Sequence, residues 1–104
     1  MLALAAISLV LTPPAEMNEV DLNIYCNAQA GIIMQYDDPE GFAEDLMMRT
    51  SEWIENAIES GATTRDHVFD MQSELFEANQ PLILADDVAA LEARFTVCRA
   101  AFGG

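Results

Sequence analysis

The sequence predicts an all-α protein, a small antiparallel four-helix bundle whose first and last helices are tied by one disulfide. Three observations lead to this prediction. No segment alternates apolar and polar residues as a half-buried strand does. The chain contains only two cysteines, Cys26 and Cys98. Near the C-terminus the apolar residues recur in steps of three and four, the spacing of one helix face: Val88, Leu91, Phe95, Cys98 and Phe102.

The N-terminal stretch, residues 1–11, is almost wholly apolar and precedes Thr12-Pro13-Pro14-Ala15. It is too short to cross a bilayer, which takes about 20 apolar residues, and it is typical of a secretory signal. We therefore expect residues 1–15 to be a cleaved signal peptide and residues 16–104 to form a single helical domain. The alternative is a buried N-terminal helix of a cytosolic protein, because no Lys or Arg precedes the apolar run.

The first two expected helices cover residues 16–36 and 39–60. In the first, Leu22, Cys26 and Ile33 share a face. We expect Asp38 to cap the second helix, with Pro39 at its first position, where the missing N–H costs nothing. Gly61 is a typical end for this helix. Its apolar stripe consists of Phe42, Leu46, Trp53 and Ala57, with Met47, Ile54 and Ile58 beside it.

The third expected helix covers residues 64–78. Thr63 and Asp66 resemble the capping box that precedes many helices. We expect the helix to end at Asn79-Gln80-Pro81, since proline disrupts a helix interior, and residues 82–84 to form a short apolar link. The inward side chains of this helix are Val68, Met71 and Leu75, with Phe69 and Phe76 alongside.

The last expected helix begins after Asp86 or Asp87, either of which is a good cap. In an up-down-up-down order the first and last helices are neighbours, so a Cys26–Cys98 bond is reasonable. By loop entropy a closed loop of about 70 residues contributes roughly 4 kcal/mol. Disulfides persist in oxidising compartments, so we expect a periplasmic or secreted protein. The alternative is a pair of buried free thiols.

The charge is strongly one-sided, with 18 acidic residues against 4 arginines and no lysine, for a net charge of -14. Such a polyanion repels phosphate backbones and anionic lipid headgroups. We therefore expect no nucleic-acid partner and no stable membrane insertion after signal cleavage. A basic protein is the favoured partner. The alternative is that the acidity serves solubility alone.

Two rows of carboxylates follow helical spacing on the second and third expected helices. Like charges three or four residues apart on a helix repel one another, and no lysine offsets them here. We interpret the rows as an anionic surface for a cationic partner, or as a pH-sensitive surface, whereas charge rows usually form a solvated face. The rows consist of Glu52, Glu55 and Glu59, and of Asp66, Asp70 and Glu74.

The sequence offers no recognisable catalytic or metal-binding motif. His67 is the only histidine, and no nucleophile motif accompanies it. Paired cysteines leave no ligand set for zinc. The acidic stretch from Asp37 fails the calcium-loop pattern, because its third position is Pro39 and its twelfth is Met48. We expect no catalytic residue, metal or cofactor, and we expect the methionines and Trp53 to fill the core.

These observations favour an exported acidic helical protein that acts by protein binding, as an inhibitor, immunity-type or accessory factor, rather than by catalysis. One alternative is an acid-activated periplasmic holdase chaperone. The general plan of an exported helical domain with one disulfide resembles small acid-stress chaperones of the HdeA type, in architecture alone. A further alternative is an enzyme that uses a carboxylate pair, since the many acidic residues offer many pairs.

Overall fold

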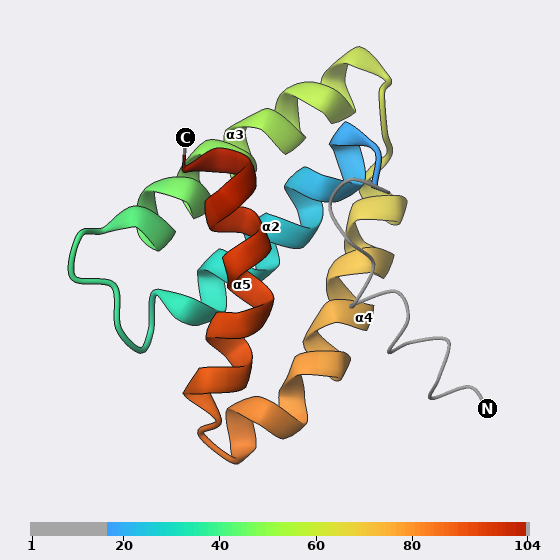
Figure 1. Ribbon diagram of the computed structural model, residues 1–104. Helices are drawn as coiled ribbons and strands as arrows, with labels where there is room; N and C mark the ends of the chain where they lie inside the picture. The colour runs from blue at the N-terminus through green and yellow to red at the C-terminus, as the bar shows by residue number, and fades with distance from the viewer. Residues whose placement is uncertain (1–16, 104) are drawn as a thin grey trace.

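A computed structural model of the chain describes residues 17–103 (Figure 1). In this range the chain forms four helices and no strand: α2 (Glu19–Ile33), α3 (Phe42–Ser60), α4 (Arg65–Leu84) and α5 (Val88–Phe102). The all-α, four-helix prediction is therefore confirmed. The antiparallel order of the helices stays a prediction, and the predicted signal peptide, residues 1–15, lies outside the described residues.

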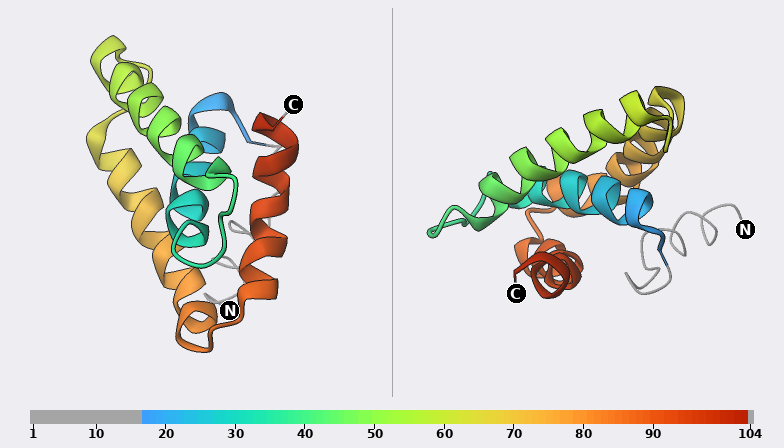
Figure 2. Two further views of the ribbon diagram at one scale, coloured as in Figure 1. Left: turned by 90° about the vertical axis from the view of Figure 1, so that its left-hand side faces the viewer. Right: turned by 90° about the horizontal axis from the view of Figure 1, so that it is seen from above.

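Helix α2 is the centre of the bundle, because it contacts each of the other three helices. Figure 2 shows α3 on one side of α2 and α5 on the other. A helix covered on several sides has to be apolar around much of its circumference. Accordingly Ile24, Cys26, Ala30 and Ile33 of α2 are all buried. The other helices are then positioned by this central element.

The predicted disulfide joins α2 to α5. Cys26 and Cys98 are bonded across a sequence separation of 72, with their Cα atoms 5.6 Å apart, and both side chains are fully buried. On α5 the bond lies within the apolar stripe, between the buried Phe95 and the half-buried Phe102. Leu91 of the same stripe is also buried, whereas Val88 in the first turn of α5 is exposed.

Two predicted helix ends are confirmed, and others are displaced; the first helix, expected over residues 16–36, is shorter and runs from Glu19 to Ile33. Gly61 has a φ of 83° and ends α3 as expected, because glycine adopts the left-handed region without steric cost. The side chain of Asp87 caps α5 by accepting from the N–H of Ala90 at 3.2 Å. The cap of α4 is Thr64 instead of Thr63. Its hydroxyl accepts from the N–H of His67 at 3.1 Å, so the predicted box with Asp66 is off by one residue.

Helix α3 begins at Phe42, three residues later than predicted. The residue at its N-cap position is Gly41 and not Asp38, although the Asp38 carboxylate accepts from the N–H groups of Ala43 and Glu44 at 3.0 Å each. Pro39 is not the first helical residue, because residues 38–41 form a turn closed by the Gly41 N–H to the Asp38 carbonyl at 3.0 Å. Gly41, with a φ of 70°, provides the left-handed conformation that leads into the helix.

The predicted end of the third helix is wrong, because α4 continues through Pro81 to Leu84. A proline inside a helix removes one hydrogen bond and costs about 3 kcal/mol or more. Here Leu82 and Ile83 pack against the core, so burial of their side chains offsets that cost. Residues 82–84 are therefore the last turn of a helix and not a separate link.

Two predictions about the core are also wrong. Met48 is 61% exposed, whereas Met71 is buried and Met47 is half-buried against the core, as expected. The two aromatic residues expected beside the inward face of α4 are largely in solvent, with Phe69 at 67% and Phe76 at 57% exposure. Trp53 is half-buried and packs against the core, as expected.

Candidate functional site

The six carboxylates of the predicted rows are all exposed, with Glu52, Glu55 and Glu59 on α3 and the other three on α4. The structure brings the rows together at one point, where Arg65 at the start of α4 donates two hydrogen bonds to Glu55, at 3.1 and 3.2 Å. This contact raises the pKa of the Arg65 guanidinium. Within residues 17–103 the remaining members of the rows form no ion pair, namely Glu52, Glu59, Asp66, Asp70 and Glu74.

The four arginines of the chain all have partners within it, so none is left to neutralise those five carboxylates. Three form ion pairs, Arg49 with Asp45 at 2.8 Å, Arg65 with Glu55 at 3.1 Å and Arg99 with Glu92 at 2.7 Å. The fourth, Arg94, donates to the side-chain oxygen of Asn79 at 2.6 Å and to the Ala78 carbonyl at 3.2 Å. The negative field of the rows is therefore largely uncompensated.

A groove runs between α3 and α4, which make few direct contacts with each other. It consists of a hollow of about 250 Å³ that α2, α3 and α4 line, and of a hollow of about 260 Å³ that α2 and α4 alone line. The two share Gln72, and together we call them the α3–α4 groove. Its floor is formed by Asn27, Ala28 and Ile32 of α2. Its α3 side is lined by Ser51, Ile54, Glu55 and Ile58, and its α4 side by Arg65, Val68, Phe69, Gln72 and Phe76.

The middle of this floor is polar. The side chain of Asn27 donates to the Met47 carbonyl at 3.0 Å and to the hydroxyls of Thr50 and Ser51 at 3.0 and 2.8 Å. Its oxygen accepts from Gln72 of α4 at 3.4 Å. Asn27 therefore links α3 and α4 to the central helix in the wall of the hollow that all three helices line.

Sequence reasoning missed the groove because it assigned Phe69 and Phe76 to the margin of the core. One signal was available: residues seven apart lie on the same helix face, and this pair is displaced around α4 from the stripe of Val68, Met71 and Leu75. That displacement places large apolar side chains beside the buried face, but it does not say whether another helix covers them.

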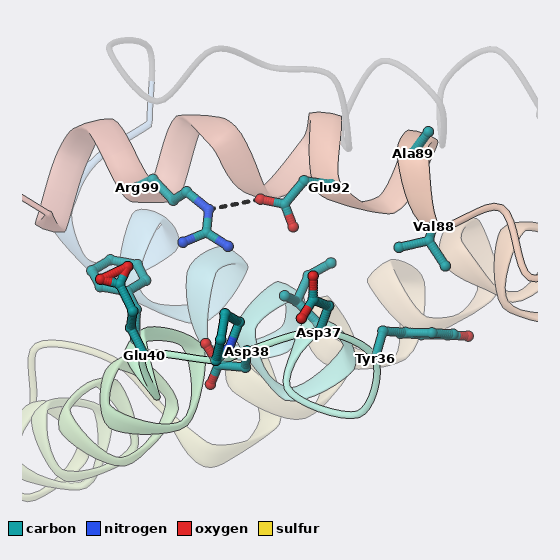
Figure 3. Close-up of a pocket in the computed structure, with 11 residues that line it drawn as sticks. Tyr36, Asp37, Asp38, Glu40, Val88, Ala89, Glu92 and Arg99 are labelled. Atoms are coloured by element: carbon teal, nitrogen blue, oxygen red, sulfur yellow. Dashed lines mark hydrogen bonds and ion pairs between the residues drawn. The ribbon is translucent and has the colours of Figure 1, made fainter.

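A third hollow, of about 450 Å³, lies between the α2–α3 connection and α5 (Figure 3). Figure 3 shows Tyr36, Asp37 and Glu40 on the connection, opposite Glu92 and Arg99 on α5. Ile33, Phe42 and Val88 supply apolar lining. This pocket could not be predicted from the sequence, since its two walls come from residues 33–42 and 88–99, which are far apart in the chain and share no motif.

Arg99 is held firmly at the edge of this pocket. Its guanidinium carbon lies 5.4 Å from the ring centre of Phe42 and 4.8 Å from that of Phe95, and its Nε donates to Glu92 at 2.7 Å. Such stacking and pairing fix the orientation of an arginine. With Asp37, Glu40 and Glu92 around it, the pocket has an excess of negative charge and suits a cationic group better than an anion.

His67 lies at the N-terminal end of α4, half-exposed, with its Nε2 at 2.8 Å from a carboxylate oxygen of Asp21 on α2. The pair links the beginnings of two helices. Among residues 17–103 the hydrogen-bond partner of this imidazole is the Asp21 carboxylate and not a serine, threonine or cysteine side chain. We interpret His67 as part of the bundle's surface packing.

In residues 17–103 no group of three or more His, Cys, Asp or Glu side chains is placed to hold a metal ion. Over the same part of the chain, no helix is both long and apolar enough to cross a membrane. Comparisons with protein families, with curated proteins and with solved structures find no match to this chain.

Proposed function

We propose that this protein is exported and acts by binding a cationic protein partner through the carboxylates of α3 and α4, without catalysis. The observation that carries the proposal is the charge arrangement. Every arginine is engaged within the chain, while five carboxylates of the two rows have no ion-pair partner among the described residues. An uncompensated field of one sign attracts an oppositely charged partner and selects against like-charged ones.

The disulfide supports the location assigned in this proposal. Bonds such as Cys26–Cys98 form and persist in oxidising compartments, including the periplasm and the extracellular space. An inhibitor, immunity-type or accessory factor that works there benefits from a small scaffold held by a covalent link. The predicted signal in residues 1–15 fits the same location.

The test is capture of partners from a periplasmic extract at low and high salt, with two variants in parallel. In the row variant three unpaired row carboxylates are neutralised: Glu52→Gln, Asp70→Asn and Glu74→Gln. The control variant loses three exposed carboxylates outside α3 and α4: Glu19→Gln, Asp86→Asn and Asp87→Asn. Both lose the same charge, so the comparison separates the rows from net charge.

We expect the wild type and the control variant to capture basic proteins that are released by salt, and the row variant to lose them. Partners without basic bias or salt sensitivity would contradict the proposal. Equal loss from both variants would show that total charge, not the rows, attracts the partner.

A second candidate function, an acid-activated holdase, is favoured by the exposed aromatic side chains Phe69 and Phe76. In this hypothesis acid protonates many carboxylates and removes their mutual repulsion and their specific pairing, which loosens helical packing and exposes apolar surface for clients. The disulfide would keep α2 and α5 together in that state. The test is binding of a fluorescent dye for apolar surface as pH falls from about 7 to about 2. If the protein stays native and the dye fluorescence does not rise over this range, the protein is not such a chaperone.

A further inference from the structure

We propose that the α3–α4 groove binds an amphipathic, positively charged helix of the partner protein. This inference rests on the proposed function and specifies where and how the cationic partner docks. Recognition of this kind places the apolar face of a helix in a groove between helices. Its physical basis here is the shape of the groove, the apolar side chains that line it and the charge beside it.

The shape of the groove follows from the packing of the bundle. Both α3 and α4 pack on α2 but make few contacts with each other. The surface of α2 is therefore reached from the groove at Asn27, between α3 and α4, and at Ala28 and Ile32, beside α4. A further helix can pack on such a surface by setting its ridges of side chains into the depressions between neighbouring side chains.

The lining supplies two apolar anchoring points. Phe69 and Phe76 stand seven residues apart on α4, which corresponds to about 10 Å along the helix axis. Each is more than half exposed, so each has apolar area that a partner can still cover. Large exposed aromatic side chains beside a hollow are the usual anchors of protein interfaces. An incoming helix with leucine-sized residues at the same spacing would contact both.

The charge beside the groove determines the sign of the partner. On α3 the groove is lined by Glu55, with Glu52 and Glu59 one turn to either side. The one cationic side chain in its lining, Arg65, already pairs with Glu55. A second copy of this chain would bring a further net charge of -14 to the same surface and would be repelled. A helix of another protein, with one apolar face bordered by Lys or Arg, would contact both the apolar side chains of the groove and the carboxylates beside it.

The probe is a fluorescently labelled peptide of about 18 residues, which is the length of five helical turns. It consists of leucine and lysine, with the leucines spaced so that they share one face of a helix. Two matched peptides accompany it: one of the same composition with leucine and lysine alternating, and one with glutamate in place of lysine. Binding to the full-length protein is measured by anisotropy at low and high ionic strength. The peptide's helicity is followed by circular dichroism.

The diagnostic variant is Phe69→Ser with Phe76→Ser, and its matched control is Leu84→Ser. Leu84 is an exposed apolar residue on the same helix, 77% exposed and outside the groove. Because all three side chains are exposed, these substitutions should leave the fold intact, which thermal melting verifies. We expect the double variant to bind the helical cationic peptide about tenfold more weakly or worse, and the control to stay within about twofold of wild type.

The outcomes separate the groove from the proposed function. Salt-sensitive binding that is unaffected by the Phe69 and Phe76 substitutions would overturn the groove proposal. It would still support the proposed function, which is binding of a cationic partner. No binding of any cationic peptide at low salt would overturn both. Equal binding of the glutamate peptide would overturn the charge argument, and equal binding of the alternating peptide would overturn the helical occupant.

Two further results would assign the groove to another occupant and overturn the proposal. One is a dimer, seen by sedimentation, that dissociates when Phe69 and Phe76 are replaced. The other is peptide binding by a chain that starts at Glu16 but not by the full-length chain, which would show that the chain's own N-terminal residues occupy the groove.

Discussion

The side-chain amide of Asn79 in α4 donates a hydrogen bond of 2.5 Å to the side-chain oxygen of Gln29 in α2, and both residues are fully buried. The oxygen of Asn79 accepts from Arg94 of α5 at 2.6 Å. One asparagine therefore connects three helices through polar contacts. The side-chain nitrogen of Gln29 is buried and has no hydrogen-bond partner among the described residues. The hydrogen bond that the Gln29 side-chain oxygen accepts from Asn79 is therefore the one polar contact of this side chain there.

Replacing Asn79 with leucine should destabilise the protein, because it leaves Gln29 buried without any partner and removes one acceptor from Arg94. We expect the free energy of unfolding to fall by about 1–3 kcal/mol. Urea titration followed by circular dichroism measures this, with Gln80→Leu, at the exposed neighbouring position, as a control expected within about 0.5 kcal/mol of wild type. Equal stability of the Asn79 variant and wild type would show that the polar contacts are dispensable.

Replacing both Cys26 and Cys98 with alanine should lower the free energy of unfolding by about 2–5 kcal/mol, because the unfolded chain is no longer constrained. Urea titration with and without reductant tests this. Reductant should lower the midpoint of the wild type and leave that of the double variant unchanged. A wild type that is insensitive to reductant under unfolding conditions would mean that the cysteines are not paired in the purified protein.

The free energy of unfolding should fall in alkali because of Tyr25. Burial raises the pKa of its phenol, and the nearby charge of Arg94 opposes that rise in part. A raised pKa in the folded state favours the neutral phenol. The stabilising contribution of the neutral phenol is therefore fully present below about pH 10, the ordinary pKa of tyrosine in the unfolded chain. It is lost as pH rises through the pKa of Tyr25 in the folded state.

The variant Tyr25→Phe tests this dependence. It removes the hydrogen bond from the phenol to the Arg94 carbonyl at 3.3 Å, so we expect a loss of up to about 1 kcal/mol near neutral pH. Above about pH 10 it should lose stability less steeply than the wild type. Parallel alkaline curves for the two proteins would show that Tyr25 does not carry the dependence.

Replacing Arg65 with glutamine should strengthen binding of the helical cationic peptide, because it frees Glu55 in the groove. Arg49→Gln is the matched control, since it removes the same charge from α3 and Arg49 does not line the groove. We expect a modest gain of about two- to fivefold for the Arg65 variant over the Arg49 variant. The same gain from both would assign the effect to net charge instead of Glu55.

Much of the fold followed from local signals in the sequence. The helical spacing of Leu91, Phe95 and Cys98 marked α5, and Gly61 and Asp87 marked helix ends, because these effects depend on residues within a turn or two. The disulfide followed from the presence of only two cysteines. The continuation of α4 through Pro81 was not predictable this way, since it depends on how Leu82 and Ile83 pack against other helices.

The candidate site was predictable only in part. The exposure of the acidic rows follows from their charge, because an unpaired carboxylate is costly to bury. The groove does not follow from sequence, since the exposure of Phe69 and Phe76 depends on the separation of α3 from α4. The central place of α2 was hidden for a related reason: only the packed structure shows that three helices cover it.

The central claim, that the carboxylates of α3 and α4 bind a cationic partner, is tested most directly by the salt dependence of affinity. The logarithm of the dissociation constant is plotted against that of salt concentration for the wild type, the row variant and the control variant, with the helical cationic peptide as ligand. We predict a steep slope for the wild type and the control variant and a clearly shallower one for the row variant. Indistinguishable slopes for all three proteins would contradict the claim.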